Sequence, residues 1–426
     1  MIRDIIKKEK RNRVSKEKSL KTIIPKIRVK NFLEAWTRKK LQSLAPLRGG
    51  FAFKSEKFQN VGIPIVRISN IGFDGTVGGE FEYYSKLNPD EKFVLKGRSL
   101  LLAMSGATTG KIAMLDSEEE YYQNQRVGYF QNNGAVDYDV LSSVLQTKAF
   151  TNQLNAVLVA GAQPNISSKE IDSFEFCIPE SIEEQSAIGT LFRTLDYLLG
   201  SYKDNLANYQ SLKATMLSKL FPKTGQTVPE IRLDGFEGEW ERGTIGEFGS
   251  FYYGKSAPKW SVTDEATTPC VRYGELYTKF STKIDKIYSY TSIPKENLKL
   301  SSGNEVLVPR VGENPLDFAN CSWLSLKNVA IGEMISVYNT PNNPLFIAYY
   351  FNAKMKKEFA KRVEGGSVAN LYYTYLENIS ISVPSLPEQQ AIGAYFSNLD
   401  NLIASLQEKI SQLKTLKKKL LQEMFI

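Results

Sequence analysis

The sequence predicts an α+β protein in which two pseudo-symmetric domains are separated by two long antiparallel coiled-coil helices. Three observations predict this class. The chain has 426 residues, which is more than one ordinary domain contains. Its second half repeats its first at an offset of about 204 residues, the distance from Ile24 to Val228. Each half ends in a stretch whose apolar residues follow heptad spacing, which is typical of a coiled coil.

The repeat runs through most of the chain. Each half begins with a Pro-x-Ile-Arg segment followed by a Phe and a Trp, and these residues are Pro25, Ile27, Arg28, Phe32 and Trp36, and then Pro229, Ile231, Arg232, Phe236 and Trp240. Residues 184–221 match residues 388–425 at 14 of 38 positions without a gap. One structural unit is therefore written twice.

Each unit begins with a globular part, at residues 24–179 and 223–384, the second of which includes a short linker. Both parts contain short aliphatic and β-branched runs broken by Gly, Asn and Pro, which indicates short strands. Helical patterns follow near 140–150 and 345–359. Each globular part is therefore expected to be a compact α+β domain, and residues 1–23 precede the first one as a basic tail.

The second part of each unit, at residues 180–222 and 385–426, is predicted to be one long helix. Apolar residues recur in alternating steps of four and three along both stretches. The predicted seam consists of Ile188, Phe192, Leu195, Leu199, Tyr202 and Leu206, and of Ile392, Phe396, Leu399, Ile403, Leu406 and Ile410. Lys213 and Lys417 interrupt the two seams at equivalent positions. Because a seam of this length needs a partner, we expect the two helices to pair with each other.

The start of each long helix carries a capping-box pattern. Ser181 precedes Glu184 by three residues, and Ser385 precedes Glu388 in the same way. This pattern predicts a hydroxyl and a carboxylate that satisfy each other's backbone N–H groups. The negative charges of the first turn would also interact favourably with the positive end of the helix dipole.

The composition excludes several classes of active site. The chain has no histidine, so a Ser-His-Asp triad, a Cys-His dyad and a histidine-based zinc site are impossible. The three cysteines, Cys177, Cys270 and Cys321, contain no CxxC pair and are too few for a four-cysteine zinc site. The segment 105–111 resembles a phosphate-binding P-loop, but Ser105 stands where that motif requires Gly. We expect no catalytic residue, bound metal or cofactor on this chain.

The charge of the chain is concentrated in its tail. The net charge is 54 − 46 = +8 and the pI is about 9.0, which suits a nucleic-acid partner. Residues 1–22 hold nine Lys and Arg against three Asp and Glu, so the other residues carry only +2. The tail is expected to form a short helix on a partner or to remain disordered. The chain lacks a signal-peptide core and an apolar run of roughly 18 residues, so we expect a cytoplasmic protein.

The repeated motifs resemble those of the DNA-specificity subunit of type I restriction-modification systems. The resemblance rests on the Pro-x-Ile-Arg…Phe…Trp start of each half and on the Ser-Gly-x-x-x-Gly-Lys loop at residues 105–111. It rests also on the Pro…Glu-Gln…Ile-Gly…Leu-Asp segment that leads into each long helix, and it covers nearly the whole chain after the tail. The second half departs from the pattern, with Pro-Arg-Val-Gly at residues 309–312 in place of the loop.

This resemblance implies two target-recognition domains, each of which recognises one half of a bipartite, asymmetric site in double-stranded DNA. It implies helices that set the distance between the halves and dock two methyltransferase (modification) subunits, with Glu184, Gln185, Glu388 and Gln389 as docking candidates. Restriction and translocase subunits would complete the complex. S-adenosylmethionine, used to methylate adenine N6, and ATP with Mg²⁺ would bind to these partners. The complex would act in the bacterial cytoplasm, and this chain would be non-catalytic.

Candidate DNA-binding residues are basic, amide, hydroxyl and aromatic side chains of the two domains, and among them Arg67 and Arg272 occupy equivalent sites at a strand end. Lysine suits a phosphate, arginine pairs with guanine, and asparagine or glutamine pairs with adenine. In the first domain the candidates are Lys54, Ser55, Arg67, Ser69, Asn70, Thr108, Thr109, Lys111, Gln125 and Arg126. In the second domain they are Lys255, Ser256, Trp260, Arg272, Tyr273, Arg310, Lys327, Asn328, Tyr372 and Tyr373. Arg67 and Arg272 could instead form internal ion pairs, and Trp36 and Trp240 are expected in the cores.

Two other functions stay open at the level of sequence. A coiled-coil scaffold or inhibitor would use the two domains to bind proteins, without sequence-specific DNA recognition. An intrinsic nuclease or methyltransferase would be active as the isolated chain, and we expect no such activity. Sequence-specific protection of a bipartite site, with the methyltransferase subunit present, distinguishes DNA recognition from the scaffold.

Overall fold

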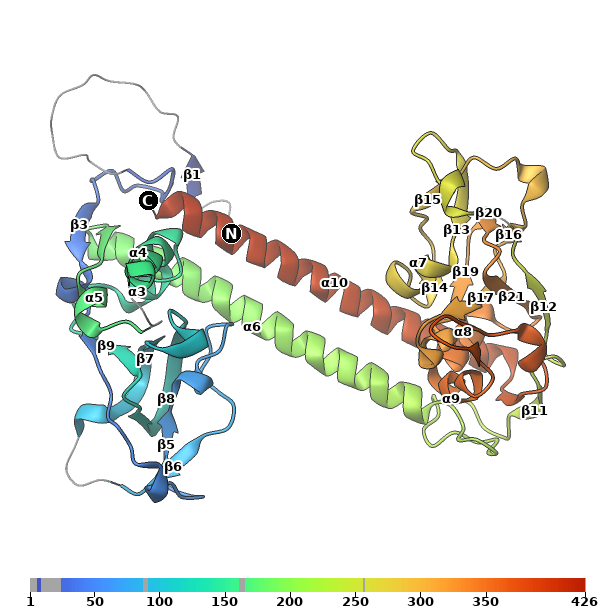
Figure 1. Ribbon diagram of the computed structural model, residues 1–426, viewed down its shortest axis with the longest axis horizontal. Helices are drawn as coiled ribbons and strands as arrows, with labels where there is room; N and C mark the ends of the chain where they lie inside the picture. Colours follow the sequence, from blue (N-terminus) through green and yellow to red (C-terminus); the bar gives the residue numbers. More distant parts are fainter. Residues whose placement is uncertain (1–5, 9–23, 87–90, 161–164, 256, 426) are drawn as a thin grey trace. The chain divides into compact units, whose positions relative to one another are not determined.

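The computed structural model describes residues 6–8, 24–86, 91–160, 165–255 and 257–425 (Figure 1). The chain forms two compact units, of which the first comprises residues 1–202 with 409–426 and the second comprises residues 203–408. Each unit contains one globular domain and one end of each long helix. The two-domain α+β class with paired long helices is confirmed.

The first domain is built on a six-stranded sheet. In sheet order its strands are β4 (Leu47–Arg48), β9 (Val127–Phe130), β7 (Val94–Ala103), β8 (Ile112–Gln123), β5 (Ile63–Val66) and β6 (Glu82–Tyr84). Leu100 and Leu102 of β7 join one apolar core, and Leu101 and Ala103 join another. Both faces of the strand are buried over residues 100–103, which explains why this part of its sequence is continuously apolar instead of alternating.

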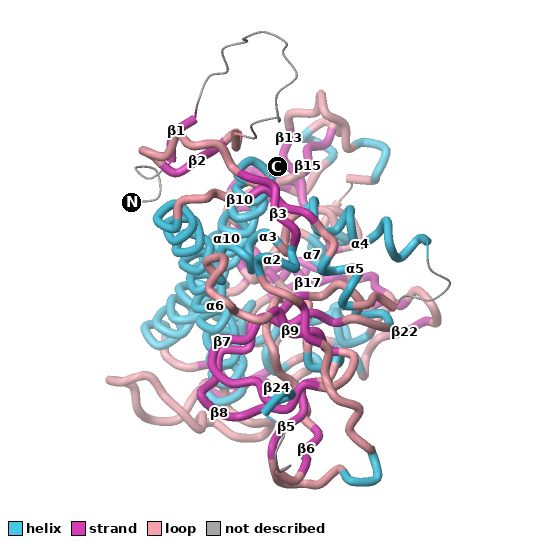
Figure 2. The backbone as a smooth tube through the Cα atoms, turned by 90° about the vertical axis from the view of Figure 1, so that its left-hand side faces the viewer, coloured by secondary structure: helices cyan, strands magenta, loops and turns pink. Residues whose placement is uncertain are grey.

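Helices and two strand pairs complete the first domain. The helices are α2 (Leu41–Leu44), α3 (Tyr138–Val144), α4 (Lys148–Ala160) and α5 (Ser168–Asp172), and β3 (Thr37–Lys40) pairs with β10 (Glu175–Ile178). From the basic tail, β1 (Ile6–Lys8) pairs antiparallel with β2 (Ile27–Val29), as Figure 2 shows. This part of the tail is therefore a strand, contrary to the predicted helix or disorder. The remainder of the tail lies outside the described residues.

The second domain distributes its strands over smaller sheets. A five-stranded sheet has the order β12 (Ser250–Tyr253), β21 (Ile335–Asn339), β17 (Glu305–Pro309), β19 (Ser322–Leu324) and β14 (Lys283–Ile284). A four-stranded sheet has the order β15 (Ser289–Thr291), β13 (Thr268–Val271), β20 (Lys327–Ile331) and β16 (Leu300–Ser302). A third sheet holds β18 (Val311–Gly312), β23 (Ala369–Asn370) and β22 (Glu364–Gly365), and β11 (Glu241–Thr244) pairs with β24 (Ser380–Val383).

The helices of the second domain are α7 (Tyr273–Thr278), α8 (Pro344–Lys354) and α9 (Lys356–Ala360). The residues from Pro344 to Phe351 are buried on every side of α8. This helix packs on β17 and β19, and the ring of Tyr349 lies 5.1 Å from that of Phe396 in the second long helix. A helix that is apolar all round is therefore buried between two neighbours.

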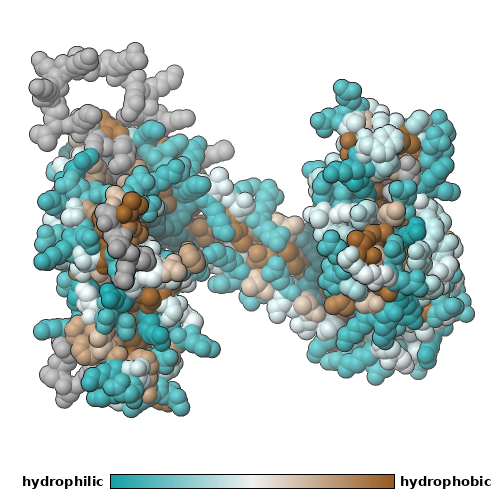
Figure 3. Space-filling model, viewed as in Figure 1, coloured by the Kyte–Doolittle hydropathy of each residue, from teal (hydrophilic) through white to brown (hydrophobic). Residues whose placement is uncertain are grey.

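The two long helices are α6 (Ile182–Lys219) and α10 (Leu386–Met424). In the first unit, the ring of Phe192 near the start of α6 lies 5.8 Å from that of Phe425, just after α10. In the second unit, Phe221 just after α6 stacks at 5.8 Å on Phe396 near the start of α10. Each unit joins the beginning of one helix to the end of the other, so the predicted antiparallel pairing is confirmed. Apolar side chains are visible along the pair in Figure 3.

Most of the predicted seam is buried. The buried members are Ile188, Phe192, Leu195, Leu199, Ile392, Phe396, Leu399, Leu406 and Ile410, and the half-buried members are Tyr202, Leu206 and Ile403. The two lysines that interrupt the seam have equivalent partners. Lys213 forms an ion pair with Asp400 in the second unit, and Lys417 forms one with Asp196 in the first. These charged pairs favour one register of the helices over its alternatives.

The glutamate at the start of each long helix forms a buried ion pair with the arginine of the Pro-x-Ile-Arg segment. Arg28 donates through Nε and Nη2 to Glu184 at 2.6 and 2.7 Å, and Arg232 donates to Glu388 at 2.9 and 2.7 Å. Both glutamate side chains are only 2% exposed. Trp36 Nε1 also donates to Glu184 at 3.2 Å. We call these two arrangements the Arg–Glu clamps.

The glutamine that follows each of these glutamates binds the N-terminus of a helix of the same domain, α3 in the first domain and α8 in the second. Gln185 accepts a hydrogen bond from the Asp137 N–H at 2.8 Å, and Gln389 accepts one from the Asn343 N–H at 2.8 Å. Both side chains are 2% exposed. Asp137 and Asn343 are the N-cap residues of α3 and α8. A Cβ on Gly189, one turn further along α6, would lie 2.5 Å from the capping oxygen of Asp137, which explains why glycine occurs there.

These contacts correct two predictions. Glu184, Gln185, Glu388 and Gln389 are buried and hydrogen-bonded within their own domains, so they do not form a docking surface for partner subunits. The capping box at Ser181 is only half formed. The Glu184 N–H does donate to the Ser181 hydroxyl at 3.2 Å, but the Glu184 carboxylate accepts from Arg28 instead of from the Ser181 N–H.

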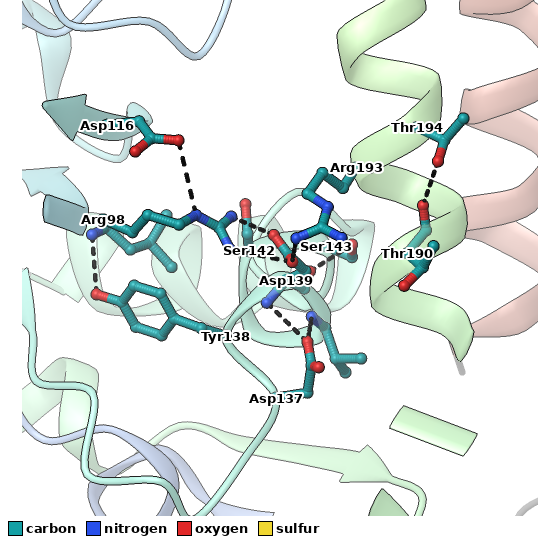
Figure 4. Close-up of polar contacts among 12 residues, drawn as sticks. Arg98, Asp116, Asp137, Tyr138, Asp139, Ser142, Ser143, Thr190, Arg193 and Thr194 are labelled. Atoms are coloured by element: carbon teal, nitrogen blue, oxygen red, sulfur yellow. Dashed lines mark hydrogen bonds and ion pairs between the residues drawn. The ribbon is translucent and has the colours of Figure 1, made fainter. Parts of the chain in front are cut away.

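A second polar network joins the first domain to α6. Asp139, at the start of α3, forms ion pairs with Arg98 of β7 and with Arg193 of α6 (Figure 4). Arg98 also lies 3.9 Å from Asp116 on β8. The carboxylate of Asp139 is 13% exposed, so it is shielded from solvent by the groups that it joins.

Among the described residues, no group of three or more Cys, Asp and Glu side chains is arranged to hold a metal ion, and no helix is long and apolar enough to cross a membrane. The three cysteines are buried, as are both tryptophans expected in the cores. Burial raises the pKa of the Cys270 thiol to about 11, so this thiol is a poor nucleophile.

Candidate nucleic-acid interface

In the first domain, backbone hydrogen bonds gather several loops at the end of β7. The Met104 N–H donates to the carbonyl of Arg126 at 2.9 Å, which places the turn after β8 beside the start of loop 105–111. The Asn124 N–H of the same turn donates to the carbonyl of Val66 at 3.1 Å. The strand end at residue 66, the loop and the turn therefore lie together.

The second domain repeats this arrangement at the end of β17. The Arg310 N–H donates to the carbonyl of Met334 at 3.1 Å, as the Met104 N–H donates to that of Arg126. Each domain thus has one arginine and one methionine at this hydrogen-bonded pair, with the two residue types exchanged. We call these positions the Arg–Met pair. These hydrogen bonds agree with the sequence repeat, in which residues 309–312 replace the loop of the first domain.

Loop 105–111 uses its hydroxyl groups internally. The Thr108 hydroxyl donates to the carbonyl of Ser105 at 3.3 Å, and the Thr109 hydroxyl donates to that of Gly106 at 2.7 Å. Gly106 has φ 73° and Gly110 has φ 88°, a left-handed conformation that favours glycine. The predicted threonines therefore shape the loop, and its lysine is the group that extends from it.

Lys111 contacts a residue that the sequence did not single out. Its Nζ lies 3.3 Å from the centre of the Phe73 ring, and Phe73 is 89% exposed at the tip of a turn between two glycines. A cation over an aromatic face is attracted by the ring. An exposed phenylalanine between Gly72 and Gly75 was the available signal, because an apolar ring at a turn tip has no role in a core.

The turn after β5 contains both an exposed and a buried candidate. Ser69 is exposed, and Arg67 is half-buried with Nη1 3.2 Å from the Glu82 carboxylate, so the alternative of an internal ion pair holds for Arg67. Asn70 is 2% exposed and donates to the carbonyls of Gly78 and Glu80 at 3.1 and 2.8 Å. The prediction that Asn70 contacts a base is wrong, because its amide is buried and satisfied.

The remaining candidates of the first domain are exposed. Gln125 and Arg126 extend from the turn after β8, beside the strand end that carries Arg67. Lys54 and Ser55 lie at the start of a short 3₁₀ segment, Ser55–Lys57. Among the described residues, no hydrogen bond connects Lys54 or Ser55 to loop 105–111.

In the second domain, Arg310 is held by aromatic rings. Its guanidinium carbon lies 4.4 Å from the centre of the Tyr253 ring and 5.3 Å from that of Tyr372. Tyr373 packs 4.6 Å from Tyr253 and stacks at 5.5 Å and 5° on Phe251. The structure brings together three predicted residues, Arg310, Tyr372 and Tyr373. Sequence reasoning missed Tyr253 and Phe251, which belong to a strand that is distant in sequence.

Five other candidates of this domain lie in two places. Lys255 and Arg272 flank the end of β20, since the Lys255 N–H donates to Ile331 and the Gly332 N–H donates to Val271, both at 2.9 Å. Tyr273 follows at the start of α7 and is 38% exposed. Lys327 and Asn328 are exposed but stand at the beginning of β20, away from the Arg–Met pair.

Two further candidates complete the comparison. Trp260 is 74% exposed on a 3₁₀ segment, Lys259–Ser261, and Ser256 lies outside the described residues. For Arg272 the ion-pair alternative is not observed, because its guanidinium has no acidic partner in the described part of the chain. Arg67 and Arg272 therefore differ, although they occupy equivalent strand ends.

A family model and two relatives all identify this chain as similar to type I restriction specificity proteins. The model of the type I restriction modification DNA specificity domain matches twice, at residues 33–208 and 237–415. The chain is 22% identical over 409 residues to the putative type I restriction enzyme MjaX specificity subunit of Methanocaldococcus jannaschii, covering 91% of this chain and 92% of that protein. It is 25% identical over 194 residues to the MjaVIII specificity subunit of the same organism, a match that spans 45% of that relative.

A solved structure has the same fold. The type I restriction-modification system S subunit from M. genitalium superposes with a TM-score of 0.60 at 16% identity, covering 95% of this chain and 99% of that one. At this identity the likeness concerns the fold alone. The shared fold agrees with the two units of this chain, each of which contains one globular domain and one end of each long helix.

Proposed function

Because the chain belongs to the family of type I restriction-modification DNA specificity proteins, with two copies of the specificity domain, we propose that it selects the DNA target for a multi-subunit enzyme. Each domain recognises one half of a bipartite, asymmetric site in double-stranded DNA. The paired helices set the spacing of the two half-sites. The observation that carries this proposal is the Arg–Met pair, because one of its two hydrogen-bonded positions is an arginine in each domain, Arg126 in the first and Arg310 in the second, where it lies against the Tyr253 ring.

Catalysis is assigned to partner subunits. Methyltransferase subunits supply S-adenosylmethionine chemistry at adenine N6, and restriction subunits supply ATP-driven translocation and cleavage. The chain has no histidine, and its cysteines are buried, which leaves few groups for acid–base or nucleophilic chemistry. The purified chain alone is therefore expected to show neither methylation nor cleavage.

The outward faces of the long helices are the proposed docking surface for the methyltransferase subunits. Tyr197 on α6 is 74% exposed, and Leu212 on α6 and Leu402 on α10 are 40% and 38% exposed. Apolar residues on the solvent side of a helix suit a protein partner. Replacing Tyr197 with Asp is expected to weaken copurification with the methyltransferase subunit, and the same change at Tyr288, which is 49% exposed in the second domain and lies outside the long helices, serves as the matched control.

The proposal is tested with the chain in complex with the methyltransferase subunit. Footprinting on a random DNA library, at two or more salt concentrations, should give protection of a bipartite sequence and binding that weakens as salt rises. A complex that assembles but protects DNA without sequence preference would refute the proposal and favour the protein-binding scaffold.

A further inference from the structure

The guanidinium of Arg310 is oriented but not satisfied. Its Nε is buried and has no hydrogen-bond partner, whereas Nη1 and Nη2 are not among the buried nitrogens. Within the described residues the guanidinium forms no ion pair and donates no hydrogen bond. Two tyrosine rings, Tyr253 and Tyr372, hold its plane instead. Two adjacent donors therefore face solvent in a fixed plane.

The first domain shows that the fold does not require this arginine. At the position of Arg310 the first domain has Met104, which is 7% exposed and packs in its core. The strand pairing places Gly49 where the second domain has Tyr253, since Leu47 pairs with Phe130 as Phe251 pairs with Tyr338.

The second tyrosine is also specific to the second domain. Leu371 donates its N–H to the carbonyl of Arg310, as Ile166 does to that of Met104, so Tyr372 corresponds to Ser167. The arginine and both flanking rings thus occur together in one domain and are absent together from the other. An unpartnered, partly buried guanidinium costs folding free energy, so its occurrence calls for a ligand.

A column of aromatic rings supports the arginine from the core. Tyr338 is fully buried, and its ring lies 4.7 Å from that of Phe251. Phe251 stacks on Tyr373, Tyr373 contacts Tyr253 at 4.6 Å, and Tyr253 contacts Arg310. Each ring limits the rotation of the next, so the guanidinium is preorganised before it meets a ligand.

We propose that Arg310 recognises a guanine in the half-site of the second domain, with Tyr253 and Tyr372 fixing the plane of its guanidinium. This inference rests on the proposed function. Guanine offers O6 and N7 in one plane, which matches the two terminal nitrogens of a rigid arginine. A phosphate contact requires only a positive charge near the backbone, and it would not require the two rings that fix the plane.

The test uses the complex with the methyltransferase subunit and a library of duplexes. Exchanging residues 24–178 for those of a relative identifies which half-site belongs to the first domain. In the other half-site, Arg310→Met and Arg310→Lys are both expected to reduce the preference for one guanine about 10- to 100-fold, because neither side chain makes the bidentate contact. Tyr372→Ser is expected to lower the same preference, and Tyr372→Phe, which keeps the ring, is expected to retain it.

The outcomes separate this inference from the proposed function. A wild-type complex without any bipartite preference would overturn both. A wild-type complex that recognises a bipartite site, with every guanine preference unchanged in the Arg310→Met variant, would overturn this inference alone. So would a phosphate pattern, in which Arg310→Lys behaves as wild type and Arg310→Met weakens all sequences equally. Unfolding of the Arg310→Met chain is expected at the wild-type denaturant concentration or above, since Met104 fills the equivalent position in the first domain.

Discussion

The Arg–Glu clamp of the second domain gives a quantitative prediction about stability. Glu388→Gln keeps the size of the side chain but removes its charge, so Arg232 loses its charged partner and keeps its hydrogen bond to the Gly238 carbonyl. The side chains of Arg232 and Glu388 are 17% and 2% exposed, so solvent cannot fully replace the lost ion pair. Breaking a buried pair on one side costs about 3–5 kcal/mol. Because the arginine keeps some access to water, we expect a loss of about 3 kcal/mol, at the lower end of that range.

This loss corresponds to a measurable shift in melting temperature. The second unit spans residues 203–408, which is 408 − 203 + 1 = 206 residues. For a domain of this size, 1 kcal/mol shifts the melting temperature by about 2–4 °C, so we expect a fall of about 6–12 °C. Thermal unfolding of the full-length chain measures this fall. Hydrogen exchange should then show lost protection at the start of α10 but not at the start of α6.

A matched control is available on α9. Glu358 pairs with Lys361 and Arg362, whose side chains are 68% and 30% exposed, so Glu358→Gln is expected to cost at most about 1 kcal/mol. Hydrogen bonds from these two residues hold the pKa of the Glu358 carboxyl below its usual value. Its contribution to stability is therefore present above the pKa of an unfolded glutamate and is lost as the pH falls through the folded-state pKa. The difference between wild type and Glu358→Gln should shrink accordingly in acid.

Two results would refute the reasoning about the clamp. One is a loss below about 1 kcal/mol for Glu388→Gln, which would give the buried pair the value of a surface pair. The other comes from the double variant with Arg232→Met. Removing both charges should restore part of the stability, so a double variant no more stable than Glu388→Gln alone would contradict an unpaired buried charge as the cause.

The remaining predictions concern equivalent positions of the repeat and the first domain. Gly189→Ala is expected to destabilise the chain by about 1 kcal/mol or more, because the new Cβ would displace the Asp137 carboxylate that caps α3. Gly393→Ala should be neutral or slightly stabilising, because its Cβ would meet its nearest atom at 3.4 Å. Denaturant unfolding of both variants checks this contrast. Phe73→Ala should leave the free energy of unfolding unchanged, because the ring is 89% exposed, but it should weaken DNA binding by the complex several-fold. Lys111→Ala should reduce the salt dependence of DNA binding by the equivalent of about one phosphate contact. Exchanging residues 24–178 should change only one half-site in a methylation map, and a change in both would contradict modular recognition.

Local patterns predicted the elements of this protein well. Heptad spacing predicted α6, α10 and their antiparallel pairing, and the repeat predicted two similar domains. These features depend on residues close in sequence or on comparison of the two halves. In the sequence, Arg28 and Glu184 belong to separate motifs. Their recurrence as Arg232 and Glu388, each pair separated by 156 residues, was the signal that could have joined them.

The candidate interface was predictable only in part. The side-chain chemistry of Arg310, Tyr372 and Tyr373 predicts contact with DNA, and the fold places them together. The chemistry of Asn70 predicts the same, yet its amide is buried in a turn. Residue type indicates which contacts a side chain is able to make, but burial depends on which strands become neighbours.

The duplicated architecture, the long helices and the lack of histidine chemistry follow from the amino-acid sequence alone, because repetition, periodicity and composition are properties of the chain. The folded domains show three further features: the Glu-Gln starts are buried and bonded within their own domains, Phe73 is exposed beside Lys111, and the Arg310 guanidinium lies against two rings without a hydrogen-bond partner in the described residues. Those outcomes depend on strand order and on contacts between segments far apart in the chain. Burial and partner choice arise from the packing of the whole domain, and no local pattern encodes them.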